Sequence, residues 1–247
     1  MPSASPNTPS PIKFSIIIPA RDEEKYIGAC LDSIEAAAKD FPGQVEVIVA
    51  INRCTDRTEE IARSRGAIIV HCDEKNLAKI RNTAAKHARG EIIVTIDADS
   101  TMTDNMLYEI DRKLSSGKYI GGGTVFRLDR TSLGIVISFM LFVPVIFMLG
   151  ILAGLFWLYR EDFEAIGGFD ESYFSGEDIA FAKRLKAYGK TKGKRFGIIS
   201  KAHIVTSSRK FDTFGDWFII THPILVYKAF TGRHREIADE IWYDTKR

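Results

Sequence analysis

With 247 residues, of which 45% are hydrophobic, the chain is long enough to bury the core of one α/β domain. Its net charge of +2 is accompanied by no DNA- or RNA-binding motif, so a nucleic-acid partner is not expected. The three cysteines, Cys30, Cys54 and Cys72, have no CxxC or metal-ligand spacing, which argues against a disulfide scaffold and favours a reducing, cytoplasmic compartment.

The chain divides into three parts by composition. Residues 1–11 are rich in Ser and Pro and lack the basic and apolar regions of a signal peptide, so a disordered tail is predicted. Residues 12–210 carry the regular alternation of strands and helices expected of one catalytic-sized domain. Residues 211–247 are expected to form an amphipathic helical segment.

Short β-branched runs alternate with amphipathic helices through the first half of the chain. In chain order we predict a strand at 13–19, a helix carrying Ile27, Leu31 and Ile34, a strand at 45–51, a helix running through Ala62, a strand at 67–71, a helix at 77–88 and a strand at 92–96. This rhythm predicts a mostly parallel sheet with right-handed crossovers. Pro19, Asn52 and Asp97 should then meet at the carboxyl edge of that sheet, where α/β proteins bind ligands.

The strand at 92–96 ends in Asp97-Ala98-Asp99. Two carboxylates one residue apart at the tip of a buried strand suit a hard cation or a ribose. The alternative is that Asp97, Asp99 and Ser100 cap a following helix, because these residue types are good N-caps.

Two features stand out in the second half. Glycines occupy 121–123, just before a predicted strand at 124–128, and either allow a close approach of the backbone to a ligand or form a simple loop. Glu177 and Asp178 precede a helix predicted at 179–188, where they either have a chemical role or simply favour the helix dipole.

Four segments together resemble the successive signatures of family 2 glycosyltransferases. They are SIIIPARDEEKYIGACLDSI, NRCTDRT, KIRNTAAKHARGEIIVTIDADS and GGFDESYFSGEDIAFAKRLKAYG. The resemblance spans Ser15 to Thr206, and four motifs in order are far more specific than a lone DxD. It implies the α/β GT-A fold, a Rossmann-like and mostly parallel sheet flanked by helices, and inverting transfer from a nucleotide sugar.

The resemblance places the donor at the carboxyl edge of the sheet. The residues it implies for donor binding are Pro19, Ala20, Arg21, Glu23, Asn52, Arg81, Asp97 and Ala98. Asp99, with Asp97 beside it, would hold Mg²⁺ or Mn²⁺, an ion that neutralises charge on a departing diphosphate. One departure concerns the base: where most relatives have a paired acid, this chain has Ile51-Asn52, so the preference for uridine over guanosine is open.

For the acceptor, the resemblance implies that Asp178 is the general base and that Glu177 binds the acceptor or orients its loop. The residues expected near the acceptor or a phosphate are Arg209, Lys210, Gly122 and Trp157. His203 is a candidate third metal ligand. If Ala202 matches the small residue that usually precedes this strand, however, the histidine position falls nearer Thr206 and His203 is an ordinary strand residue.

Residues 132–152 form an uncharged, apolar insertion long enough to span a bilayer. A single span would separate Asp97 and Asp99 from Glu177 and Asp178, so we exclude it. The insertion is expected to dip into one leaflet as two short helices, to form an interface in a homo-oligomer, or to pack inside the core.

The apolar and aromatic residues within 214–230, with the acid-free basic run at 183–210, favour contact with an anionic membrane surface. We therefore expect a cytoplasmic protein, peripherally or monotopically bound to the inner face of the membrane, with a lipid-linked acceptor such as a polyprenyl phosphate. If that acceptor is already an anionic phosphate, Asp178 would position it. The alternatives are a nucleotidyltransferase on a similar sheet and a silent module that binds sugar nucleotides or scaffolds a membrane complex.

Overall fold

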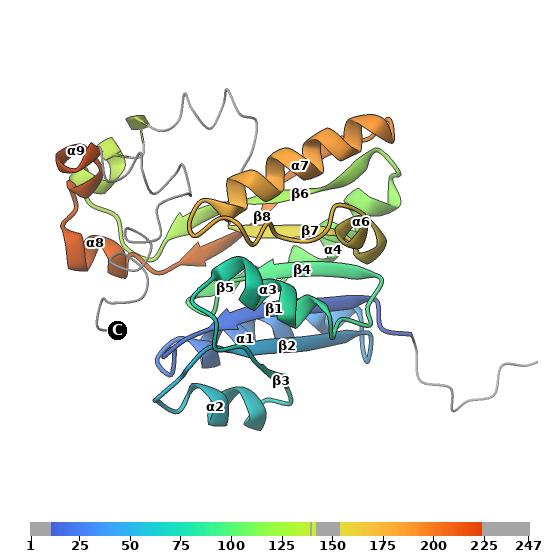
Figure 1. Cartoon of the computed structure of the whole chain (residues 1–247), viewed down its shortest axis with the longest axis horizontal. Helices are drawn as coiled ribbons and strands as arrows, with labels where there is room; N and C mark the ends of the chain where they lie inside the picture. Colours follow the sequence, from blue (N-terminus) through green and yellow to red (C-terminus); the bar gives the residue numbers. More distant parts are fainter. Residues whose placement is uncertain (1–10, 139, 142–153, 224–247) are drawn as a thin grey trace, which may run out of the picture.

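The computed structural model describes residues 11–138, 140–141 and 154–223, and one mixed sheet organises this part of the chain (Figure 1). The spatial order of its eight described strands is β3-β2-β1-β4-β7-β6-β8-β5. The strands are β1 (Phe14–Ala20), β2 (Val45–Ile51), β3 (Ile68–His71), β4 (Ile92–Ile96), β5 (Ser100–Met102), β6 (Tyr119–Leu128), β7 (Leu155–Tyr159) and β8 (Arg195–Thr206). The helices are α1 (Ile27–Ala37), η1 (Ala38–Asp40), α2 (Thr58–Ser64), α3 (Leu77–Ala85), α4 (Met106–Ser115), α6 (Arg160–Ala165), α7 (Glu177–Thr191), α8 (Arg209–Phe214) and α9 (Phe218–Thr221).

The first four strands form the parallel half of the sheet that the sequence predicts. β1 pairs in parallel with β2 on one side and with β4 on the other, and β2 pairs in parallel with β3. These strands are rich in β-branched residues, and β4 is buried along its whole length, as expected for a strand covered on both faces.

The second half of the sheet is mixed. β7 lies antiparallel between β4 and β6, β8 runs parallel to β6, and β5 pairs antiparallel with the end of β8. Because β5 starts at Ser100, a strand and not a helix follows Asp97 and Asp99, and α4 begins only at Met106. The alternative in which these acids and Ser100 cap a following helix is therefore wrong.

Helices cover both faces of the sheet, and each face has its own apolar cluster. On one face α1 and α4 pack through residues such as Ile34 and Ile110. On the other, α3, α6 and α7 pack around aromatic rings, with Phe169 stacked on Phe181 of α7 at a centroid distance of 4.2 Å. This second cluster brings α3 and the start of α7, which are far apart in sequence, to the same face.

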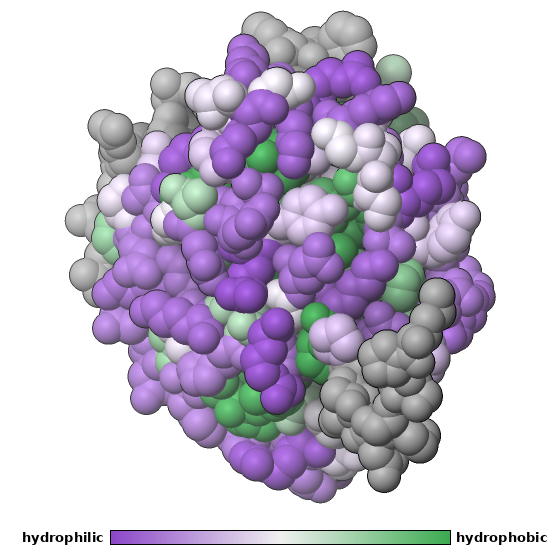
Figure 2. Space-filling model, turned by 90° about the vertical axis from the view of Figure 1, so that its right-hand side faces the viewer, coloured by the Kyte–Doolittle hydropathy of each residue, from purple (hydrophilic) through white to green (hydrophobic). Residues whose placement is uncertain are grey.

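The basic run is spread along the molecule. Its residues between 183 and 195 lie on α7 and at the start of β8, whereas Arg209 follows the other end of β8. β8, a strand of 12 residues whose pairing with β6 is irregular near its middle, lies between the two groups. Figure 2 views the end of the molecule at which β1 begins, and this face is mostly hydrophilic.

The predicted membrane segments lie largely beyond the described part of the chain. Residues 142–153, most of the apolar insertion, and residues 224–247, most of the C-terminal segment, are outside it. Among the helices that the structure describes, none combines the length and apolar character needed to cross a bilayer.

Candidate active site

The carboxyl ends of β1, β2 and β4 meet at one edge of the sheet. Asn52, directly after β2, donates its backbone N–H to the carbonyl oxygen of Ala20 over 2.8 Å. Asp97 directly follows β4, which pairs with β1 on its other side. Pro19 and Ala98 belong to the same edge, so the loops expected to converge do converge.

Arg81, on α3, lies buried between two acidic loops. Its Nη2 donates to Oδ1 of Asp97 over 2.8 Å, and its Nη1 donates to Oε1 of Glu177 and Oδ1 of Asp178 over 2.8 and 2.7 Å. The ring of Phe169 lies 5.2 Å from the guanidinium carbon. One guanidinium thus joins the acid at the end of β4 to the acid pair at the start of α7.

The loop before α7 is fastened to α3 by two asparagines that the sequence analysis did not single out. Asn82 accepts from the backbone N–H of Phe169 and donates to its carbonyl, each over 2.9 Å, and Asn76 donates to the carbonyl of Tyr173 over 3.1 Å. Gly168 has a φ of 65°, and a Cβ there would lie 2.6 Å from Oδ1 of Asn82, so only glycine fits. Asn82 directly follows Arg81, which is the local signal that could have identified it.

Three carboxylates, those of Asp97, Glu177 and Asp178, bind the one guanidinium of Arg81. Burial alone would lower the pKa of Arg81, but the charges of Asp178, Asp97 and Glu177 hold it above its usual value, so the guanidinium stays charged. Burial raises the pKa of Glu177 to about 7, with the charge of Asp178 acting in the same direction and Arg81 opposing both.

Glu177 and Asp178 differ in their exposure to solvent. The side chain of Glu177 is 7% exposed and that of Asp178 is 29% exposed. Asp178 can therefore contact a substrate while Glu177 packs inside. Because Arg81 stabilises the charged form of both, Asp178 is held in place as a hydrogen-bond acceptor.

Arg209, at the start of α8, forms a second cluster with two predicted donor-site acids. Its Nη1 and Nη2 bind the carboxylate of Glu23 over 2.7 and 2.6 Å, and Nη2 also lies 3.0 Å from Oδ2 of Asp99. The ring of Tyr26 lies 5.2 Å from the guanidinium carbon. The backbone carbonyl of Asp99 accepts from Ser207, which brings β5 and α8 together.

The residues at this edge fit a divalent cation. Asp97 and Asp99 offer carboxylate oxygens, the ligands that Mg²⁺ and Mn²⁺ prefer, and the side chain of Asp97 is 43% exposed. Each of these carboxylates already has a guanidinium partner, Arg81 for Asp97 and Arg209 for Asp99, so a bound ion would share or replace these contacts.

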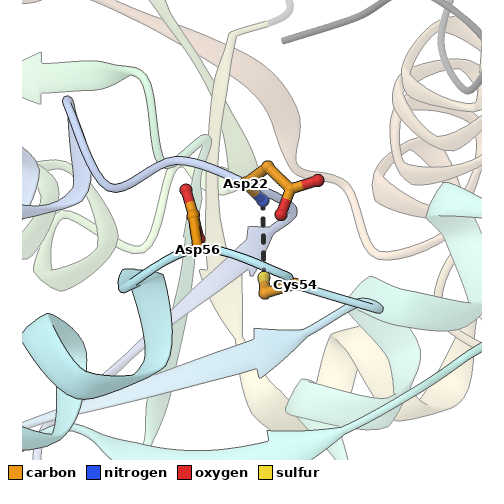
Figure 3. A group of neighbouring side chains, drawn as sticks. All are labelled: Asp22, Cys54 and Asp56. Atoms are coloured by element: carbon orange, nitrogen blue, oxygen red, sulfur yellow. Dashed lines mark hydrogen bonds between the residues drawn. The ribbon is translucent and has the colours of Figure 1, made fainter.

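A further group, Asp22, Cys54 and Asp56, places one ligand atom from each residue within 4.8 Å of the others (Figure 3). Burial raises the pKa of the Cys54 thiol, which disfavours the thiolate that metals bind. Asp22 accepts from the backbone of Thr55 over 2.7 Å. Asp56 accepts from the backbone N–H of Glu24, in the loop after β1, over 3.0 Å. These bonds give the acids a structural role in joining the loops after β1 and β2.

The hydrogen bonds of Asn52 give a structural reason for an amide after β2, where the family resemblance would place an acid. Its side-chain Nδ2 donates to the carbonyls of Cys72 and Glu74 over 2.5 and 2.9 Å, tying the end of β2 to the loop after β3. Its Oδ1 is buried and has no hydrogen-bond partner among the described residues. The amide thus has a structural task that a carboxylate, which cannot donate, could not perform.

We expect Asn52→Asp to destabilise the protein by about 1–3 kcal/mol, because a carboxylate oxygen would face two carbonyl oxygens with no proton to donate. Urea unfolding at pH 7.5 measures the change. Thr55→Val, at an exposed residue of the loop after β2, is the comparison. Equal stability of Asn52→Asp and the native protein would contradict the structural role.

Gly122 and Trp157, predicted near the acceptor, instead belong to the core. Trp157 is 0% exposed and its Nε1 donates to the carbonyl of Gly123 over 3.0 Å. Gly122 pairs with Trp157 in the sheet, and a Cβ on Gly122 would overlap the carbonyl oxygen of Gly197 on β8. The glycine allows the strands to pack closely. The prediction that Gly122 and Trp157 contact the acceptor or a phosphate is therefore wrong.

His203 does not lie opposite Asp99 in the pairing of β5 with β8. The carbonyl of His203 accepts from Thr103, whereas the carbonyl of Asp99 accepts from Ser207, four residues further along the chain. This register favours the alternative in which the histidine position of the family falls near Thr206. His203 is therefore an ordinary strand residue, and its prediction as a metal ligand is wrong. Burial lowers the pKa of His203, with Arg127 acting in the same direction. The side chain of Lys210 is outside the described residues.

An exposed apolar surface lies beside the Arg209 cluster. It consists of Leu133, Val136, Met140, Leu141, Trp217 and Ile220, each of which is at least 37% exposed. Arg130 holds its two segments together by binding Asp212 on α8 over 2.6 Å and Asp216 over 2.8 Å. We name these six residues the apolar surface.

Comparison with protein families gives two matches. The model for glycosyl transferase family 2 matches residues 15–169, and the model for the N-terminal domain of galactosyltransferase matches residues 137–207. The first covers more than half of the chain and includes Arg81, Asp97 and Asp99.

Two curated relatives share part of the sequence. The chain is 35% identical over 104 residues to the low-salt glycan biosynthesis hexosyltransferase Agl6 of Haloferax volcanii. The matched region covers 42% of this chain and 25% of Agl6. It is 36% identical over 103 residues to the poly(ribitol-phosphate) beta-N-acetylglucosaminyltransferase TarS of Staphylococcus aureus, which covers 39% of this chain and 18% of TarS. The chain thus spans a quarter or less of the length of these relatives.

Solved structures share the fold. S. aureus TarS 1–349 in complex with UDP-GlcNAc superposes with a TM-score of 0.62 and 20% identity, covering 93% of this chain and 70% of that one. Glucosyl-3-phosphoglycerate synthase from Mycobacterium tuberculosis, in complex with Mn²⁺, UDP and phosphoglyceric acid, superposes with a TM-score of 0.61 and 20% identity, covering 90% and 79%. The predicted α/β GT-A fold is confirmed.

Proposed function

The chain belongs to glycosyl transferase family 2, and on that basis we propose that it transfers a sugar from a nucleoside-diphosphate sugar to an acceptor with inversion at the anomeric carbon. The observation that carries this proposal is the position of Arg81, which binds Asp97 on the donor side and Asp178 on the acceptor side with one buried guanidinium. The groups that we propose for the two substrates are thereby held next to each other.

The donor side takes the nucleotide and its diphosphate. Asp97, whose side chain is partly exposed, is proposed to face the ribose, and Asp99 to hold Mg²⁺ or Mn²⁺. When bound, such an ion would neutralise the negative charge on the departing diphosphate. TarS and glucosyl-3-phosphoglycerate synthase were solved with UDP-GlcNAc and with UDP and Mn²⁺ respectively, which supports a donor of this class here.

On the acceptor side, Asp178 is proposed to accept the proton of the attacking hydroxyl. A carboxylate suits this task because the hydroxyl becomes acidic only as its bond to the sugar forms. Arg81 orients the Asp178 carboxylate, and Glu177 fixes Arg81 from the buried side. An acceptor that is already an anionic phosphate would leave Asp178 with a positioning role.

The acceptor is proposed to be lipid-linked or presented at the cytoplasmic face of the membrane. The support is the apolar surface next to Arg209, together with the uncharged sequence that continues from it through residue 152. The basic residues at 190–195 lie at the end of α7 and at the start of β8, and they do not contribute to this support.

The proposal is tested by release of nucleoside diphosphate from UDP-, GDP- and dTDP-sugars with Mn²⁺ or Mg²⁺, with and without vesicles that carry polyprenyl phosphate. We expect release from one donor, abolished by EDTA and stimulated by the vesicles. Asp99→Ala should lower kcat/KM by about a hundredfold or more, because the ion would lose its ligand. Asp104→Ala, at an exposed aspartate bound to Lys39, is the matched control.

Three results would count against this function. Release of pyrophosphate in place of nucleoside diphosphate would identify a nucleotidyltransferase. Tight binding of a sugar nucleotide with no turnover, even with the vesicles present, would identify a silent binding module. Full activity of Asp99→Ala would remove the assigned metal site.

A further inference from the structure

Arg209 binds the carboxylate of Asp99, the residue that the proposed function assigns to the divalent cation. We propose that Arg209 is an internal cation that holds Asp99 until a donor arrives, so that the site accepts the divalent ion together with a diphosphate in preference to the ion alone. This inference rests on the proposed function, because it assumes that Asp99 is the metal ligand. It adds that the ion binds together with the diphosphate. Arg209 then binds first Asp99 and afterwards the diphosphate.

The contacts of Arg209 are unequal, and this inequality determines which one yields. Two parallel bonds of 2.7 and 2.6 Å join it to Glu23, whereas one longer contact of 3.0 Å joins it to Asp99. The side chain of Glu23 is 5% exposed and that of Asp99 is 14% exposed. Glu23 is therefore the permanent anchor, and the contact with Asp99 is the weaker and more accessible one.

The surroundings allow the side chain to move while its backbone stays fixed. The carbonyl of Arg209 accepts from Thr213 over 3.1 Å, and its N–H donates to the hydroxyl of Ser207 over 3.3 Å. Asp212, on the same helix, is held by Arg130. The backbone of Arg209 is thus held separately from its side chain, and the proposed exchange is a turn of the guanidinium about Glu23 and not a movement of α8.

Charge then decides between the ion alone and the ion with a diphosphate. A bare Mn²⁺ approaching Asp99 meets the positive guanidinium and must displace it without offering it another anion. A diphosphate that arrives with Mn²⁺ supplies that anion, because phosphate oxygens accept two hydrogen bonds from one guanidinium. Displacement of Arg209 is unfavourable in the first case and compensated in the second.

The test measures Mn²⁺ binding by electron paramagnetic resonance, with Mn²⁺ alone and with Mn²⁺ plus UDP or GDP. In Arg209→Gln we expect Mn²⁺ alone to bind about tenfold more tightly, since one favourable competing contact is lost, and Mn²⁺ with nucleotide to bind about tenfold more weakly. In Glu23→Gln, where Asp99 is the remaining acid for Arg209, Mn²⁺ alone should bind more weakly than in the native protein. Arg65→Gln, which removes a surface pair with Asp32, is the control.

Opposite signs for the two variants would be hard to obtain from a simple folding defect, and thermal melts check folding directly. Unchanged or weaker binding of Mn²⁺ alone to Arg209→Gln would overturn the proposal, as would no detectable Mn²⁺ binding to either protein. If those results came with metal-dependent donor turnover that is lost in Asp99→Ala, only this inference would fail. Absence of both turnover and binding at Asp99 would count against the proposed function itself.

Discussion

Replacement of Arg81 with Met is expected to lower the free energy of unfolding by about 3–5 kcal/mol at pH 8 and to abolish turnover. Arg81 is 4% exposed, and its removal takes away the cation that the buried Glu177 shares with Asp178. Urea unfolding measures the loss of stability. Because Met fills a similar volume, a cavity would contribute little to the change.

The pH dependence separates charge from packing in this variant. In the native protein Glu177 has a pKa of about 7 against an ordinary value of 4.5, so the folded state binds the extra proton between these values. The contribution of this group to stability is present below pH 4.5 and is lost as the pH rises to 7, by about 3 kcal/mol. In Arg81→Met the loss should be smaller at pH 5 than at pH 8, because a protonated Glu177 needs no counter-ion.

The double variant Arg81→Met/Glu177→Gln is the control for this argument. It removes the buried charge together with its partner, so it should recover at least half of the stability lost at pH 8 while remaining inactive. Equal stability of the single and double variants at pH 8 would show that packing, and not the uncompensated charge of Glu177, accounts for the loss.

For Asp178→Asn we expect kcat to fall by about 10²–10⁴-fold with an unchanged or slightly higher stability. The amide keeps the shape of the side chain but cannot accept the proton of the acceptor hydroxyl. Stability is maintained because three carboxylates surround one guanidinium, and removal of one charge reduces their mutual repulsion. Donor turnover and urea unfolding, measured on the same preparations, test the two parts.

Asp104→Asn provides the matched change at an exposed aspartate that pairs with Lys39 and is not part of the Arg81 cluster. A kcat within a few fold of the native value in Asp178→Asn would contradict its role as base and would point to an acceptor that is already anionic. A large loss of stability would instead show that Asp178 is needed to hold Arg81.

Local patterns were enough to predict most of the parallel half of the sheet. β2 was predicted with its observed bounds, and the meeting of Asn52 and Asp97 at one edge followed from strand direction alone. The strand order of the second half was not available from the sequence, because β7 inserts antiparallel between β4 and β6 and no local signal specifies that partner.

The composition of the site was predictable, but the contacts within it were not. The motifs identified Arg81 and Asp178 separately, whereas the bond between them connects residues 97 positions apart and depends on how α3 and α7 pack. The same limit explains the errors at Trp157 and His203. Both lie on strands, and which way a strand residue points depends on a register that was not known before the structure.

The shared guanidinium of Arg81 has a consequence for the way such proteins can diversify. Because one side chain binds both the β4 acid and the α7 acid pair, the proposed donor and acceptor halves of the site are not independent modules. A chimera that takes residues 167–210 from a relative will work only if the incoming loop places its acids within reach of Arg81 and accepts the clasp of Asn82. New acceptors are therefore more readily gained by exchanging residues outside this contact, where no donor-side group depends on the change.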